Sequence, residues 1–561
     1  MKKINSIIAL LSLAAALSSC DFLNRDPSDR ITEQEVFSKI ETAEQYLNNA
    51  YAFLPDFQTS TEDDQGRYKL GGGTDEIGYQ QSSTVTQTPY DFNLGNWNPT
   101  AMPMQRNWAD YYGCIRRCNV LIKNYDLIPE EMSTGTSNRK ERLLGEAYCL
   151  RGYFYFLLFQ QWGGVPLITE PLGVSDVEEL KAITRATAEE TVQQILEDLT
   201  EAKKHLPVKH DDANFGRVTS LVCDGIKARL LLYWASPLWN TTNDVARWEE
   251  AAIANAEMIQ AAEDAGHTLA IKYSFLFNQP AVQEEVIWCN NNYYLECYWW
   301  DVYAMPLGYG AFNVDGPLQE MVDEFEMKTS NEIPVLGYRE NNTQILNPLA
   351  TDYDPLHPWE GREDRFYSCI LYHGAMLQGR PIDISTNGLD NINIGNIVRT
   401  NYFTNKYLDQ DHNLLTHAGL TYRRFALLRT AEFYLNAAEA YNEFGGPTST
   451  VYKYVNAIRK RAGQKDLPEG LSKKEMREKI RHERKIELCF ENHRFWDVRR
   501  WMIAETVDNG KVHKVAVDEN GKITYPVFQT RTFDPEKHYL FPIPQSEIDK
   551  NRGLEQNPGW E

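Results

Sequence analysis

The sequence has no apolar run long enough to cross a bilayer, although its N-terminus holds a short one. That run covers Ile7–Leu17, whereas a spanning helix needs roughly 20 apolar residues. It follows Lys2 and Lys3 and is closed by small residues before Cys20, an order that is typical of a secretory signal. We therefore expect residues 1–19 to be a signal peptide, and we expect no membrane-spanning segment after it.

Cysteine is scarce, and the common catalytic motifs are missing. Nine cysteines in 561 residues form no dense disulfide framework. Cys114 and Cys118 stand four apart on a predicted helix, but no second Cys or His pair lies nearby to complete a zinc site, so buried free thiols are the better interpretation. The sequence lacks the HExxH, GxxxxGK[ST] and GxSxG motifs and any Asp-rich EF-hand loop. No cofactor and no metal ligand is predicted.

Basic residues are fewer than acidic ones: 57 Lys and Arg face 79 Asp and Glu, which gives a formal net charge of −22. A protein of this charge repels nucleic acid and anionic headgroups, so neither is predicted as a partner. Apolar residues make up 42% of the chain and aromatic residues 12%. That composition is typical of a globular protein and not of a disordered one.

Helical periodicity dominates two parts of the chain, about 33–265 and about 425–561, and predicts a mostly α fold with few short strands. Helices are expected over 192–206, 220–239, 248–262, 427–445, 450–462 and 472–503. Paired helices with small and aromatic residues at the packing positions resemble degenerate tetratricopeptide units. A β-hairpin is expected over 515–525, with its turn at Asn520-Gly521.

Two further segments differ from these helices. Residues 20–32 are polar and contain Pro27, so they predict an extended tether that could reach about 40 Å. The stretch that ends at Cys20 resembles the lipobox of bacterial lipoproteins. Between about 266 and 424 the helical period fades and Gly, Pro, Asn and aromatic residues rise. We expect this loop-rich insertion within one domain, 33–561, to carry a binding site.

Acidic side chains at helical spacing offer one candidate for catalysis. Glu483, Glu487 and Glu491 recur every four residues, and a glycosidase needs two carboxylates that flank a bond. Basic residues lie among them within reach of helical ion pairs: Arg484, Lys485, Arg494, Arg499 and Arg500. A structural lattice of salt bridges is therefore the favoured interpretation.

Aromatic residues in the loop-rich insertion suggest a different kind of site. Residues 289–317 are rich in rings that follow no helical period, and Trp97, beside Asn98, and Trp359 stand in other polar loops. Flat rings can take the C–H faces of a pyranose, while adjacent Asn, Asp or Arg groups take its hydroxyls. Ordinary packing is the simpler interpretation of any single ring. For the cluster as a whole we expect at least two exposed rings.

Several stretches are similar to the SusD/RagB family of outer-membrane lipoproteins from Bacteroidetes. GEAYCLRGYFYFLLFQQWGGVPLITEPL resembles its Glu-Ala-x-x-x-Arg segment, although Gly152 stands where Ala is usual. HYLFPIPQSEIDKNRGLEQNPGW resembles its Pro-Ile-Pro and Gln-Asn-Pro-Gly ending. Together with the Cys20 lipobox, the resemblance spans almost the whole chain. It rests on residues 145–172, 427–446, 455–463, 483–501 and 538–560.

The resemblance implies a binding protein and not an enzyme. It implies lipidation at Cys20, a surface position on the outer membrane, and tetratricopeptide-like helices with a variable binding region. It further implies capture of oligosaccharide or polysaccharide and its delivery to a SusC-like TonB-dependent barrel transporter. By position, the ligand-binding candidates are Trp97, Asn98, Tyr298, Trp299, Trp300 and Trp359.

Three alternatives remain open at this point. RagB-like members of the family handle peptides, so the ligand could be a peptide. A surface glycosidase could use Glu483 and Glu491, or central acids such as Asp301 and Asp315. A pure scaffold would bind no small ligand.

Overall fold

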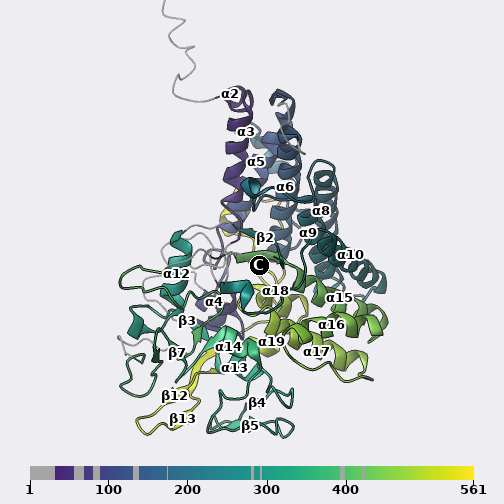
Figure 1. Cartoon of the computed structure of the whole chain (residues 1–561). Coiled ribbons are helices and arrows are strands. Elements are labelled where there is room, and N and C mark those ends of the chain that lie inside the picture. Colours follow the sequence, from purple (N-terminus) through teal and green to yellow (C-terminus); the bar gives the residue numbers. More distant parts are fainter. Residues whose placement is uncertain are drawn as a thin grey trace, which may run out of the picture.

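The computed structural model has two parts, a set of long helices and a region of loops and short elements (Figure 1). The predicted signal peptide, Cys20 and nearly all of the predicted tether lie outside the described residues. The structure describes residues 32–55, 69–79, 89–130, 138–173, 175–278, 284–290, 294–391, 399–419, 423 and 425–560.

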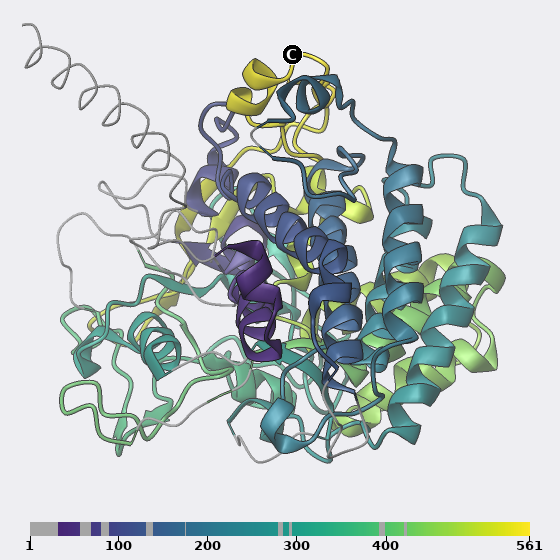
Figure 2. The same cartoon turned by 90° about the horizontal axis from the view of Figure 1, so that it is seen from above.

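The long helices form one continuous array. Each packs against the next in chain order as far as α15, which then contacts both α16 and α17; from above, they lie side by side (Figure 2). The prediction of a mostly helical fold is confirmed. These helices are α3 (Ile40–Tyr51), α5 (Asn107–Lys123), α6 (Arg139–Trp162), α8 (Ala188–Lys203), α9 (Ser220–Ala235), α10 (Val245–Asp264), α15 (Thr430–Gly445), α16 (Ser449–Arg461) and α17 (Lys473–Glu487).

Local signals in the sequence set the ends of these helices. Thr187 and Glu190 form a reciprocal capping box at the start of α8, which satisfies two backbone donors that the helix leaves free. The central helix, α6, ends at Gly163, whose φ is 77°. A Cβ at that position would lie 2.7 Å from the Trp239 ring, so glycine alone combines this backbone geometry with this close approach.

Shorter helices occupy the connections and the loop-rich region. They are α2 (Glu33–Phe37), α4 (Pro89–Leu94), α7 (Val177–Ala182), α11 (Phe275–Asn278), α12 (Tyr294–Ala304), α13 (Gln319–Glu324), α14 (Asp364–Cys369), α18 (His493–Arg500), α19 (Ala504–Val507) and α20 (Gln545–Lys550).

The strands of the described residues pair as seven antiparallel two-stranded sheets. The predicted hairpin over 515–525 is confirmed as β12 and β13, with Val517 opposite Ile523. The pairs are β1 (Ile77–Tyr79) with β3 (Asp315–Pro317), β2 (Val286–Asn290) with β10 (Phe425–Arg429), β4 (Val335–Tyr338) with β5 (Gln344–Leu346), β6 (Ile370–Leu371) with β9 (Phe403–Thr404), β7 (Met376–Leu377) with β8 (Arg380–Pro381), β11 (Gly510–His513) with β14 (Val527–Arg531), and β12 (Ala516–Val517) with β13 (Ile523–Thr524).

Two helix predictions were wrong in part: one helix begins later than predicted, and the other is two helices. Leu427 and Leu428 belong to strand β10 and not to the following helix, because this segment pairs with β2. The helix predicted over 472–503 is broken into α17 and α18, where Phe490 and Asn492 have φ values of 62° and 63°. The backbone N–H of Leu70 donates to the Asn492 side chain at 2.8 Å, a distant contact that helps to fix the break.

A buried lattice of ion pairs joins the helices to the loop-rich region. Glu487 and Glu491 both accept hydrogen bonds from Arg429 of β10 at 2.7 Å. Burial opposes ionisation of Glu487, but the surrounding arginines, Arg461 foremost, lower its pKa to about 2. Glu483 pairs with Arg365 of α14 at 2.6 Å. The predicted structural lattice is confirmed, but the basic partners of these three glutamates come from other elements and not from neighbouring turns.

Replacing Arg429 tests how much this lattice contributes. Arg429 is 1% exposed, and Arg429→Met leaves buried carboxylates without their shared cation. We expect the free energy of unfolding to fall by about 3–5 kcal/mol, measured by guanidinium chloride titration. Lys181→Met is the control, because it removes an exposed pair with Glu178 and should change stability by less than about 1 kcal/mol. Equal effects of the two substitutions would contradict the proposed role of the lattice.

Glu76 provides a test of pH dependence. It is 1% exposed, and neither carboxylate oxygen has a hydrogen-bond partner in the described part of the chain. Burial raises the pKa of Glu76 well above its ordinary value, with Cys489 and Asp75 adding to the shift. The contribution of Glu76 to the stability of the fold is therefore fully present below the ordinary pKa of about 4.3. It is lost as the pH rises through the raised pKa of the folded state.

We expect Glu76→Gln to melt about 2 °C higher than the wild type at pH 8 and at the same temperature near pH 4. At pH 8 the Glu76 carboxyl ionises in the unfolded wild type, where water stabilises it, and this favours unfolding. The amide of the variant stays uncharged in both states, so it has no such effect. Differential scanning calorimetry from pH 4 to 8 measures the difference. The control is Glu340→Gln, since the Glu340 side chain is exposed. A Glu76→Gln difference that does not grow with pH would show that Glu76 is not held neutral in the fold.

Candidate ligand-binding surface

Helix α12 positions the aromatic residues that the sequence singles out. Cys297, Trp300, Asp301 and Ala304 are buried at a spacing of three and four residues. Val302 and Tyr303 are buried too, so among residues 297–304 only Tyr298 and Trp299 are partly accessible. The sequence predicts loops and short strands in this region, and that expectation was wrong for α12 (Tyr294–Ala304). Buried residues on different sides of the helix, such as Trp300 and Val302, obscure its period in the sequence.

The other side of α12 carries rings that solvent reaches. Tyr298 and Trp299 are half-buried, and the Trp299 ring stacks on Tyr303 with centroids 5.6 Å apart and planes at 21°. Phe312, in the loop beyond α12, is 55% exposed and lies 6.4 Å from the Tyr303 ring, which is itself only 4% exposed. We call Tyr298, Trp299 and Phe312 the α12 aromatic surface, and Tyr303 lies buried beneath it. Phe312 was not predicted as a site residue, because its exposure depends on how the loop after α12 packs.

A buried charged group supports this surface from below. Asp301 accepts hydrogen bonds from Arg423 at 2.6 and 3.0 Å and lies 2.8 Å from Nδ1 of His412. The Tyr298 ring packs 5.8 Å from His412 and 5.2 Å from His417. Because Asp301 is fully buried and already paired, it holds α12 against Asp409, His412 and Arg423 and has no free carboxylate for acid catalysis.

Trp97 and Asn98 lie elsewhere. Trp97 is 3% exposed, stacked 5.0 Å from His538 and packed 4.6 Å from Trp560. The expectation that it offers a ring face to a ligand conflicts with this burial, which the C-terminal segment provides. Asn98 is exposed, but its side-chain oxygen accepts hydrogen bonds from Thr100 and Ala101 and so closes a turn.

Trp300 and Trp359 are also buried. Trp300 is 1% exposed, its indole N–H donates to the Lys406 carbonyl at 3.2 Å, and Lys69 lies 3.9 Å over its ring. Trp359 is 8% exposed and donates to the Tyr402 hydroxyl. Of the six predicted ligand-binding residues, the structure brings only Tyr298 and Trp299 together on an accessible surface.

The acids considered for glycoside hydrolysis are all enclosed. Glu483 and Glu491 are 1% and 3% exposed. Burial opposes the ionisation of both carboxyls, but their arginine partners outweigh this effect and lower both pKa values. Asp315 is buried against Lys69 at 2.8 Å. These carboxylates cannot flank a glycosidic bond without the lattice opening.

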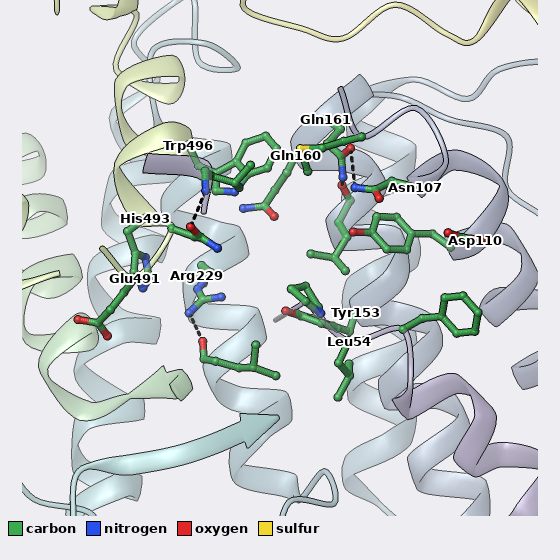
Figure 3. Close-up of a pocket in the computed structure, with 18 of the residues that line it drawn as sticks. Leu54, Asn107, Asp110, Tyr153, Gln160, Gln161, Arg229, Glu491, His493 and Trp496 are labelled. Atoms are coloured by element: carbon green, nitrogen blue, oxygen red, sulfur yellow. Dashed lines mark hydrogen bonds between the residues drawn. The ribbon is translucent and has the colours of Figure 1, made fainter. Parts of the chain in front are cut away.

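A small cavity lies between α5, α6, α9 and α18 (Figure 3). Asn107, Gln161 and Arg229 are among its polar lining residues, and its volume is about 110 Å³. A volume of this size is enough for several waters. Burial, with Arg229 and other nearby cations, lowers the pKa of His493 at its edge well below the ordinary value, so this side chain is neutral at pH 7.

A larger groove of about 520 Å³ lies between α5, α7 and α20 and is lined mainly by aliphatic and aromatic side chains such as Trp108 and Leu554.

No cluster of three His, Cys, Asp or Glu side chains suited to a metal ion occurs in the described residues. Among the helices that the structure describes, none has the length and apolar character of a membrane span.

Comparison with known proteins now identifies the family. A SusD-like protein from Formosa agariphila is 26% identical over 100% of this chain and 99% of its own length. The crystal structure of a SusD-like protein from Bacteroides fragilis is 27% identical, covers 95% of this chain and 100% of that chain, and has a TM-score of 0.78. A laminarin-binding SusD-like protein has a TM-score of 0.61 at 23% identity and covers 92% of this chain and 99% of that chain.

The family models agree with these relatives and confirm the resemblance, and the similarity to solved SusD-like structures confirms the tetratricopeptide-like helical fold. One, described as starch-binding and associating with the outer membrane, matches residues 21–232. The other, the SusD family model, matches residues 280–560, which is half of the chain. This chain therefore belongs to the SusD family, a carbohydrate-binding family associated with the outer membrane.

Proposed function

We propose that this protein is a surface lipoprotein that binds oligosaccharides or polysaccharide through the α12 aromatic surface and delivers them to a SusC-like TonB-dependent barrel transporter. The observation that carries the proposal is the set of accessible rings formed by Tyr298, Trp299 and Phe312. The laminarin-binding relative supports a glycan as the ligand.

The form of the surface suits a chain of sugars better than a single small molecule. Tyr298 and Trp299 stand edge to face, with centroids 5.3 Å apart and planes at 70°, and the Phe312 ring extends the surface beyond Tyr303. Rings in this arrangement can contact the C–H faces of successive sugars. The buried Asp301 group fixes α12, so the rings need little reordering when a ligand binds.

The proposed anchor would keep this surface near the transporter. A lipid on Cys20 would hold the chain on the outer membrane, since stable anchoring takes at least two acyl chains, and the diacylglyceryl group of a lipoprotein provides them. The tether 20–32 leads to α2, which lies at the end of the long helices away from the loop-rich region (Figure 1). A tether of about 40 Å leaves the body free to move while it remains bound.

Trp299→Ala tests the site. We expect it to weaken glycan binding about 10-fold, because it removes roughly 50 Å² of apolar contact, and to lower the melting temperature less than Trp97→Ala does, because only part of the Trp299 ring is packed. Isothermal titration against a panel of neutral polysaccharides, laminarin included, measures the affinity. Phe444→Ala, which removes another exposed ring on α15, should bind normally. Trp97→Ala should instead lower stability by about 3–5 kcal/mol, as other buried aromatic truncations do.

Two results would overturn the proposal. One is wild-type affinity of Trp299→Ala for every glycan that the protein binds. The other is binding of peptides with no binding of any glycan, which would favour the RagB-like alternative.

We also propose that binding occurs without hydrolysis, and the buried state of Glu483 and Glu491 supports this. Prolonged incubation of the protein with a bound oligosaccharide should leave the ligand intact in a chromatographic assay. Glu483→Gln should lower the melting temperature, because it disturbs the pair with Arg365. Sustained product formation that Glu483→Gln abolishes would instead identify a glycosidase.

A further inference from the structure

Two buried thiols from distant parts of the chain touch each other. Cys369 ends α14 in the loop-rich region, and Cys489 lies just beyond α17 of the helical array. Their sulfur atoms are 3.6 Å apart across a sequence separation of 120 residues, and both side chains are fully buried. The two elements that carry them are already held together by the pair between Arg365 and Glu483.

The surroundings favour reaction between these two sulfurs. The Tyr273 hydroxyl lies 3.5 Å from Sγ of Cys369 and donates to the Glu487 carbonyl at 3.0 Å. Lys406 donates to the Cys489 carbonyl at 2.8 Å, which places a cation beside the pair. Burial opposes ionisation of the Cys369 thiol, but the contact with Cys489 and the Lys406 ammonium lower its pKa. Cys369 is therefore the better nucleophile of the two.

We propose that Cys369 and Cys489 are oxidised to a disulfide as the exported chain folds, so that a covalent bond joins the loop-rich region to the helical array. The sulfurs must approach by about 1.5 Å to reach bonding distance. This inference rests on the proposed export, because structural disulfides persist in oxidising compartments outside the cytosol.

The chemistry needs an external disulfide as the oxidant, for example a thiol–disulfide exchange catalyst or oxidised glutathione. The Cys489 thiolate attacks that disulfide and forms a mixed disulfide while one thiol leaves. The Cys369 thiolate then attacks the sulfur of Cys489 and expels the second thiol. Two protein thiols are oxidised, one external disulfide is reduced to two thiols, and the two protons pass to those thiols. The first exchange takes place before folding buries Cys489, and the second takes place as folding brings Cys369 against it.

Peptide mapping tests the bond directly. The exported protein is unfolded in an alkylating reagent without reduction, digested and analysed by mass spectrometry. We expect one peptide pair linked through Cys369 and Cys489, and alkylated thiols at Cys114 and Cys118, which serve as internal controls on one helix. Full alkylation of Cys369 and Cys489 overturns the proposal. A bond from either of them to another cysteine overturns it as well.

A stability measurement gives a second readout. We expect a reductant to lower the melting temperature of the wild type by about 4 °C, because the bond closes a long loop in the unfolded chain. It should leave the double variant Cys369→Ala/Cys489→Ala unchanged. Cys114→Ala is the matched control and should keep the wild-type response. A wild type that does not respond to reduction contradicts the proposal.

The test also separates this inference from the proposed function. Oxidative refolding of the purified chain in a mixture of reduced and oxidised glutathione requires neither export nor ligand. A linked Cys369–Cys489 peptide in that experiment supports the bond even where no glycan binds. Its absence there, with glycan binding intact, overturns the bond alone.

Discussion

Three carboxylates in the interior, Glu483, Glu487 and Glu491, dictate how the two parts of this protein fit together. Each ion taken from water costs several kcal/mol, which is recovered only where every partner is in place. The partners of these glutamates come from β10, α14 and α16 and from Lys406 of the loop-rich region. A displaced loop-rich region would leave buried charges unpaired, so the lattice selects one arrangement of that region on the helices.

The candidate site depends on the same lattice through a short chain of contacts. Glu491 pairs with the Lys406 ammonium at 2.6 Å, and the Lys406 carbonyl accepts the indole N–H of Trp300 at 3.2 Å. Trp300 lies on the inward face of α12, so its position sets the direction in which Tyr298 and Trp299 face outward. The accessible rings are thus held by polar contacts that begin in the helical core, together with the apolar cluster on which Tyr298 and Trp299 pack.

The sequence alone allows the helices and the hairpin β12–β13 to be predicted, because both depend on local periodicity and turn chemistry. It does not reveal β10, whose strand partner β2 lies far back in the chain, or the break at Asn492, which a contact from Leu70 helps to fix. For the same reason Trp97 and Trp299 look alike in the sequence. The packing of the C-terminal His538, Phe541 and Trp560 against Trp97 makes it a core ring, and the sequence does not reveal these contacts.

The accessible apolar area of these rings limits how tightly the surface can bind a ligand. Tyr298 and Trp299 each retain roughly 50 Å² of accessible ring, and covering that area is worth about 1.3 kcal/mol. The two rings provide about 2.5 kcal/mol before the loss of ligand freedom is subtracted, so one or two sugars would bind weakly. A longer chain that also contacts Phe312 gains further area without a second loss of overall translation. The geometry therefore favours extended glycans over their monomers, and weak individual contacts allow a captured chain to be released to a transporter.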